Sequence, residues 1–178
     1  MSKPRLTKEA WINAGLSALK EHGPDALKAE ALARRLGTTK GSFYWHFKDI
    51  PAYHDGLLDV WLASAVDDFS ATLNAAETAP LQLRQIAKAP DGDTALSDPQ
   101  TEAALRAWAQ GNHTVANVIA EADERRTQMI TDLLRQLGVT DSDFAAVLFA
   151  ARIGLQMQDH PRQSEAIEKL VDLILALR

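Results

Sequence analysis

The sequence predicts an all-α protein, and three observations support that prediction. Apolar residues recur every three or four positions along most of the 178-residue chain, which is the spacing of a helix face. Glycine and proline residues divide this pattern into segments of helical length. No stretch alternates apolar and polar residues as a half-exposed strand does, and we find no internal repeat or low-complexity tract.

Two helices are expected in the first part of the chain. The first covers residues 7–22, where Thr7 fits as the N-cap and apolar residues follow at helical spacing. Gly23-Pro24 ends this helix, because proline cannot continue it. The second helix covers about 25–36, with leucine and alanine on one face.

A tight turn leads from the second helix to a very short third helix. Gly37 ends the second helix, Thr38 or Thr39 can cap the third, and the third covers roughly 40–46. A helix of about ten residues, a turn opened by glycine and a second short helix form the helix-turn-helix arrangement. In DNA-binding proteins the second of these helices enters the major groove.

A long amphipathic helix is expected next, and five more follow it. Ile50-Pro51 starts the long helix, since proline is tolerated at the first helical position, and the helix runs to about Asn74. The turn residues of APDGDTALSDPQ (89–100) predict an exposed loop. The helices after the long one are expected at 80–89, 99–110, 113–137, 141–158 and 162–177.

Four of the chain's eleven aromatic residues fall between Phe43 and Phe47. At 100° per residue, these two phenylalanines lie about 40° apart on a helix and share one face. We expect that face to anchor the short helix in the core. Trp45 is central on the opposite face, so the aromatic cluster divides into an inner pair and an outer set.

The outer set suits the DNA major groove. A glycine allows close backbone approach, a serine can bond base edges, and aromatic rings can contact thymine methyl groups or sugars. Lysines at either end can bind phosphate. The alternative is that Tyr44 and Trp45 pack against the long fourth helix. The candidate DNA-binding residues are Lys28, Lys40, Gly41, Ser42, Tyr44, Trp45, His46 and Lys48.

The charge distribution agrees with a polyanion at the first third of the chain. Residues 1–50 carry nine Lys/Arg against five Asp/Glu, a net +4. Residues 51–178 carry ten against nineteen, a net −9, and the two values sum to the −5 of the whole chain. A basic N-terminal segment on an acidic body suggests that only this segment meets nucleic acid. Chance clustering of solvated charges is the alternative.

Other classes of protein lack support in the sequence. There is no cysteine, the five histidines are scattered, and His54-Asp55 and Asp159-His160 have no nucleophile or third partner in motif spacing. We therefore expect no catalytic site, no metal and no cofactor. The N-terminus does not resemble a signal peptide and no apolar run reaches membrane-spanning length, so we expect a cytoplasmic protein without a membrane partner.

The segment LARRLGTTKGSFYWHFK (residues 32–48) resembles the N-terminal signature of the TetR (tetracycline-repressor) family of bacterial regulators. The likeness rests on Leu32-Ala33, on Gly37, and on the run from Thr39 to Phe47, and it covers about the first 50 residues. It implies a helix-turn-helix DNA-binding domain over residues 1–49. Residues 50–178 would then form a helical domain for effector binding and dimerisation.

Two departures from the family pattern bear on DNA binding. The family usually has a phosphate-binding lysine at the start of the fourth helix, where this chain has Ile50-Pro51, which leaves Lys48 as the nearer substitute. The second helix normally opens with Thr or Ser, where this chain has Lys28-Ala29-Glu30. Glu30 near a phosphate is repulsive unless a neighbour neutralises it or it turns to solvent. We therefore expect weaker or more salt-sensitive DNA binding than in a fully matching member.

The resemblance also implies a ligand-responsive regulator, most simply a repressor, that binds a palindromic operator as a homodimer and is released by a small molecule. A helical interaction module that has lost specific DNA binding is the alternative. The expected dimer contacts, on the apolar stripes of the last two helices, are Phe144, Leu148, Ala151, Leu155, Ile167, Leu170 and Ile174. The candidate effector contacts, each of which could equally be core, are Trp61, Phe69, Trp108, His113, Asn117 and Met157.

Overall fold

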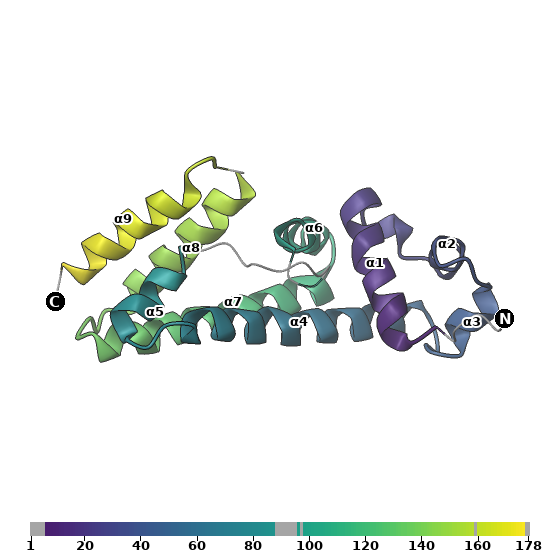
Figure 1. Ribbon diagram of the computed structural model, residues 1–178. Coiled ribbons are helices and arrows are strands. Elements are labelled where there is room, and N and C mark those ends of the chain that lie inside the picture. The colour runs from purple at the N-terminus through teal and green to yellow at the C-terminus, as the bar shows by residue number, and fades with distance from the viewer. Residues whose placement is uncertain (1–5, 88–95, 97, 159, 177–178) are drawn as a thin grey trace. The chain divides into compact units, whose positions relative to one another are not determined.

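The computed structural model describes residues 6–87, 96, 98–158 and 160–176, and within these residues the secondary-structure elements are all helices (Figure 1). Most of the loop expected over 89–100 lies outside the described residues. Among the described helices, none is both long and apolar enough to cross a membrane. The elements are α1 (Lys8–His22), the 3-10 turn η1 (Pro24–Ala26), α2 (Ala29–Arg35), α3 (Lys40–Tyr44), α4 (Ile50–Asn74), α5 (Ala79–Gln85), α6 (Pro99–Ala109), α7 (His113–Gln136), α8 (Asp143–Met157) and α9 (Gln163–Leu175).

The helices form two compact units. Unit 1 comprises Met1–Ser64 and Gly92–Ile119, and unit 2 comprises Ala65–Asp91 and Ala120–Arg178. The long helices α4 and α7 each begin in unit 1 and end in unit 2. Unit 1 therefore contains more than the expected domain of residues 1–49, because α6 packs on α1.

The helix ends follow the local signals in the sequence. Thr7 Oγ1 accepts a hydrogen bond from Ala10 N at 3.2 Å, and Thr39 Oγ1 accepts one from Ser42 N at 3.3 Å. Both threonines are therefore N-caps, which confirms Thr7 and selects Thr39 over Thr38. Gly37 follows α2 with a φ of 61°, a left-handed conformation that favours glycine, and ends that helix as expected.

The second helix is shorter than the sequence suggested. The expected helix began near residue 25, but Pro24–Ala26 instead form a 3-10 turn that ends at Leu27, and α2 begins only at Ala29. Leu27 is 1% exposed, so burial of its side chain accompanies a break in the helical backbone, with φ −80° and ψ 49° at that residue. Tertiary burial therefore overrides the helical pattern here.

An aromatic cluster forms the core of unit 1 around the short α3. The Phe43 ring centroid lies 5.4 Å from that of Trp11, 5.3 Å from that of Phe47 and 5.3 Å from that of Tyr53. All four side chains are buried. Tyr53, whose role was not recognised from the sequence, also donates a hydrogen bond from its hydroxyl to Trp11 O at 3.0 Å. The cluster thus joins α1, α3 and the start of α4.

The core of unit 2 is built from α5, α8 and α9 with parts of α4 and α7. Phe69 is buried in it, beneath the guanidinium groups of Arg126 and Arg152, which lie 5.9 Å and 5.6 Å from its ring centroid. These arginines also donate hydrogen bonds to backbone carbonyls, at Ala65 and Ile86 respectively. Both guanidinium groups therefore have hydrogen-bond partners within unit 2, as charged groups near a core require.

Candidate nucleic-acid interface

The short α3 presents an outer face beside its buried one. Phe43 is fully buried, whereas Trp45 is 82% exposed and Tyr44 is 48% exposed. The division of the aromatic run by helical angle is therefore confirmed. Trp45 does not pack against α4, because a side chain in such a contact would be largely covered. The Tyr44 ring contacts the Phe43 ring in a T-shaped arrangement, with centroids 5.3 Å apart.

The smaller residues of this face are open to contact from outside. Gly41 is exposed, and an added Cβ there would meet only Thr39 Oγ1, at 3.7 Å, so the fold itself does not require glycine at this position. Ser42 and His46 are half-buried beside it. A surface with a glycine, a hydroxyl, an imidazole and two exposed rings can approach base edges and sugars closely.

The three lysines of the interface have different surroundings. Lys28 Nζ lies 3.5 Å from Asp25 Oδ1, and Lys40 Nζ lies 2.8 Å from Glu30 Oε1. Lys48 is exposed and has no ion-pair partner among the described residues. The Glu30 side chain is thus neutralised by a neighbour, one of the two outcomes the sequence left open.

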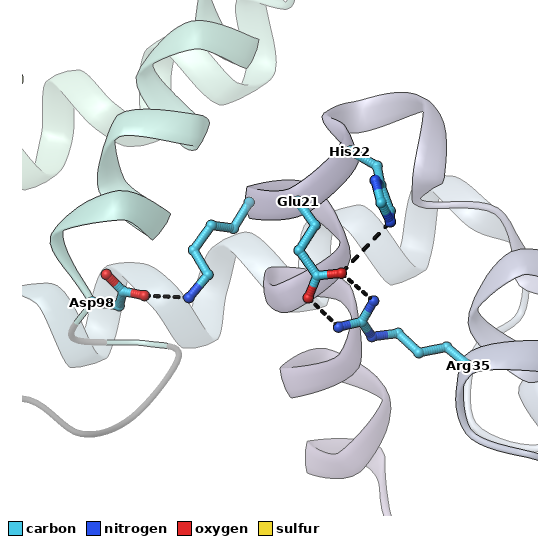
Figure 2. Close-up of polar contacts among 5 residues, drawn as sticks. Glu21, His22, Arg35 and Asp98 are labelled. Atoms are coloured by element: carbon cyan, nitrogen blue, oxygen red, sulfur yellow. Dashed lines mark hydrogen bonds and ion pairs between the residues drawn. The ribbon is translucent and has the colours of Figure 1, made fainter.

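The helix that precedes the turn is held to α1 by a bidentate ion pair. Glu21 in the last turn of α1 accepts two hydrogen bonds from the Arg35 guanidinium, one of them 2.8 Å long from Nη1 to Oε2 (Figure 2). These bonds lower the pKa of Glu21. The neighbouring Lys20 pairs with Asp98, which caps α6 by accepting from Gln100 N at 2.8 Å. The last turn of α1 therefore contacts both α2 and the start of α6, a role that the sequence analysis missed because these partners are distant in sequence.

The candidate effector residues are not gathered in one place. Trp61 and Trp108 are buried in unit 1, while His113 and Asn117 are exposed on α7. Phe69 belongs to the core of unit 2, and Met157 is half-exposed there. Trp108 alone of the six lines the open cleft of about 570 Å³ in unit 1, whose lining residues are Leu19, Lys20, Gly23, Pro24, Ala104, Ala107, Trp108 and Gly111.

The candidate dimer residues divide between core and surface of unit 2. Leu148, Ile167 and Ile174 are at most 2% exposed, so contacts within the chain already cover their side chains. Phe144, Ala151, Leu155 and Leu170 pack on that core but remain partly exposed. Among the described residues of these helices, the strongly exposed large apolar side chains are Val147 and Met157 on α8 and Leu173 on α9. Neither Val147 nor Leu173 was among the expected dimer contacts. Helical periodicity alone does not tell which side of a wide apolar stripe faces inward.

The arrangement of α2 and α3, with the exposed outer face of α3, defines a helix-turn-helix protein with a helical body. Residues 12–50 match the family model described as "Bacterial regulatory proteins, tetR family". The tetracycline repressor protein class A from transposon 1721 of Escherichia coli is 39% identical over 59 residues, which are 33% of this chain and 27% of that protein. The chain therefore spans only about a quarter of the length of this curated relative.

Two solved structures share the fold over nearly the whole chain. A TetR-family transcriptional regulator from Rhodococcus sp. has a TM-score of 0.78 at 18% identity, covering 94% of this chain and 98% of that one. A transcriptional regulator from Saccharomonospora viridis, solved in complex with choline, has a TM-score of 0.74 at 15% identity, covering 95% of each chain. The relatives are regulators rather than enzymes. The family match of this chain therefore lies in residues 12–50, and over the rest of its length the chain shares the fold of these regulators.

Proposed function

We propose that the chain is a transcriptional repressor that binds a palindromic operator as a homodimer and is released by a small molecule. The observation that carries DNA binding is the exposed outer face of α3, with Trp45 82% exposed beside the fully buried Phe43. An exposed tryptophan costs hydration free energy unless a partner covers it, and the basic segment around it attracts phosphate.

The outer faces of α8 and α9 support the dimer. Val147 is 53% and Leu173 is 67% exposed, and Ala150 is exposed on the same helix as Val147. An added Cβ at Gly154 would meet no atom within 4 Å, so this face of α8 is open to close approach. A two-fold arrangement of this surface would place two recognition helices on the half-sites of a palindrome.

The dimer is tested by the hydrodynamic size of the chain at micromolar concentration. We expect light scattering to give the mass of a dimer, and Leu173→Lys to give the mass of a monomer, because a charge at the centre of an apolar interface is not solvated. The matched control is Leu81→Lys on α5, where the side chain is 50% exposed, and it should leave the dimer intact. A monomeric wild type, or a dimeric Leu173→Lys variant, would contradict this arrangement.

The cleft in unit 1 supports an effector site. Its volume of about 570 Å³ is within the range of small-molecule sites, and its lining residues are apolar apart from Lys20. Trp108 is one of the lining residues, and indole rings bind quaternary ammonium groups as well as apolar rings. Choline, which accompanies the Saccharomonospora viridis neighbour, is therefore a reasonable first compound to add.

The DNA-binding function is tested by mobility shift with the DNA upstream of the gene that encodes the chain. We expect a discrete shifted complex that unlabelled upstream DNA displaces and scrambled DNA does not. Adding choline and other small molecules to the same reaction tests release. Only weak retardation indifferent to sequence would instead support the second candidate, a helical interaction module. That candidate is favoured by the Glu30–Lys40 pair and by Ile50 at the start of α4, both of which reduce the positive charge available to phosphate.

A further inference from the structure

Two opposite charges face each other across the turn of the helix-turn-helix. Glu30 lies in the first turn of α2, and Lys40 is the first residue of α3. Lys40 Nζ donates a hydrogen bond to Glu30 Oε1 over 2.8 Å. The Glu30 side chain is 69% exposed and the Lys40 side chain is 51% exposed, so the pair is open to solvent at the start of α3.

Both groups are charged in this pair. The hydrogen bond from Lys40 lowers the pKa of Glu30, and the same bond raises the pKa of Lys40. Arg34, one turn further along α2, lowers the pKa of Glu30 as well. The carboxylate is therefore an anion surrounded by cations, with its oxygen in the hydrogen-bonding position beside the ammonium that a phosphate oxygen could otherwise take.

We propose that Glu30 competes with DNA phosphate for Lys40 and thereby limits the affinity of the protein for DNA. This inference rests on the proposed DNA-binding function. In the helix-turn-helix arrangement the first helix crosses the DNA backbone, so α2 brings Glu30 close to phosphates. For Lys40 to bind a phosphate, the bond to Glu30 must be broken and a bare carboxylate must stay near the polyanion.

Instead of competing with phosphate, a carboxylate at this place could accept a hydrogen bond from cytosine N4 in the major groove. The observed geometry favours competition, because the carboxylate is already bonded to Lys40. Competition and base contact have different effects on DNA affinity. Competition lowers affinity equally for every DNA sequence, whereas a base contact changes the preference at one base pair.

Competition for Lys40 also changes the expected salt dependence of DNA affinity. The departures from the family pattern led us to expect weaker or more salt-sensitive binding. A lysine bonded to a carboxylate of its own chain makes no phosphate contact and releases no counterion from DNA. We therefore expect weaker binding with a shallower dependence on salt than the variant in which Lys40 is set free.

The test compares wild type with Glu30→Gln, which keeps the size of the side chain and removes its charge. Dissociation constants are measured on the upstream DNA and on a scrambled duplex over a range of salt concentrations. Glu30→Gln is expected to raise affinity on both duplexes by the same factor, roughly two- to tenfold at low salt. The slope of log affinity against log salt should steepen by about 0.9, the value for one additional phosphate contact.

Two further variants assign the effect to Lys40. Lys40→Gln should leave the wild-type slope nearly unchanged, and the double variant Glu30→Gln/Lys40→Gln should lose the steeper slope. Glu121→Gln is the matched control for net charge, since Glu121 forms a similarly exposed pair with Arg125 on α7. It should change neither affinity nor slope.

The outcomes separate this inference from the function on which it rests. Unchanged affinity in Glu30→Gln, or a gain equal to that of Glu121→Gln, would overturn the competition. A change of preference at one base pair, without a change of slope, would overturn it in favour of base reading. If neither wild type nor Glu30→Gln binds either duplex at low salt, the proposed function fails and this inference fails with it.

Discussion

Replacing Trp45 by alanine is expected to weaken sequence-specific DNA binding and to leave the stability of the protein unchanged. The side chain is 82% exposed, so its loss opens no cavity and should change the free energy of unfolding by no more than about 0.5 kcal/mol. In the complex the same ring would be covered by DNA. Loss of such a base-edge contact costs about 1–3 kcal/mol of binding free energy, a factor of roughly 5 to 150.

The measurement is a pair of dissociation constants together with a thermal midpoint. Affinity for the upstream DNA should fall, affinity for a scrambled duplex should stay within about twofold because phosphate contacts remain, and the midpoint should not move. Val60→Ala on α4 is the control for loss of exposed apolar surface, since Val60 is 37% exposed within the same unit. Equal losses on both duplexes would show that Trp45 does not read sequence. A lowered midpoint would mean that the ring is part of the fold.

The parts of the fold that depend on neighbouring residues were predictable. Thr7 and Thr39 accept hydrogen bonds from backbone groups three residues on, and Gly37 adopts the left-handed conformation that ends α2. Each of these interactions spans few residues, so the sequence contains both partners side by side. The division of the aromatic run between Phe43 and Trp45 also needs only the helical angle.

The parts that depend on distant residues were not predictable in the same way. The bond between Glu30 and Lys40 crosses a turn, and that between Lys20 and Asp98 joins residues 78 positions apart. Tyr53 is an intermediate case, because it lies four residues before Leu57 on the apolar face of α4 and could have been assigned to the core. The residues against which Tyr53 packs could not have been predicted from the sequence.

The candidate dimer surface shows the same limit for packing. The apolar stripes of the last two helices were correctly expected, but they are wide, and one side of each fills the core of unit 2. Leu148 is buried there whereas Val147 beside it is exposed. Adjacent positions on a helix differ by 100°, so the rotation of the helix about its axis decides which of the two faces the core. Only the packed structure fixes that rotation.

Gly15 allows α1 to approach the start of α4 at the centre of unit 1. An added Cβ at this position would lie 1.8 Å from the Tyr53 hydroxyl oxygen and 3.0 Å from Leu57 Cδ1. Tyr53 cannot move away freely, because it is fully buried and donates its hydroxyl hydrogen to Trp11 O. The close approach therefore requires a residue without a side chain.

Gly15→Ala is consequently expected to destabilise the protein although alanine favours a helix. Overpacking a filled core costs about 1–3 kcal/mol, and the displaced hydroxyl loses a hydrogen bond worth about 1 kcal/mol. The higher helix propensity of alanine offsets at most about 1 kcal/mol of this. The net loss of about 1–3 kcal/mol should be measurable as a lower midpoint of urea unfolding at unchanged slope.

Two variants show whether the clash with Tyr53 is the cause. Tyr53→Phe removes the hydroxyl at a cost of about 1 kcal/mol, and in that background Gly15→Ala should cost less than it does in the wild type. The ring carbon Cζ still lies 3.0 Å from the new Cβ, so we expect the relief to be partial. Gly56→Ala on α4 is the matched control, because an added Cβ there meets its nearest atoms at 3.6 Å and should be neutral or stabilising. If Gly15→Ala behaves like Gly56→Ala, α1 and α4 are not in the close contact on which the aromatic cluster depends, and the support for α3 must come from elsewhere.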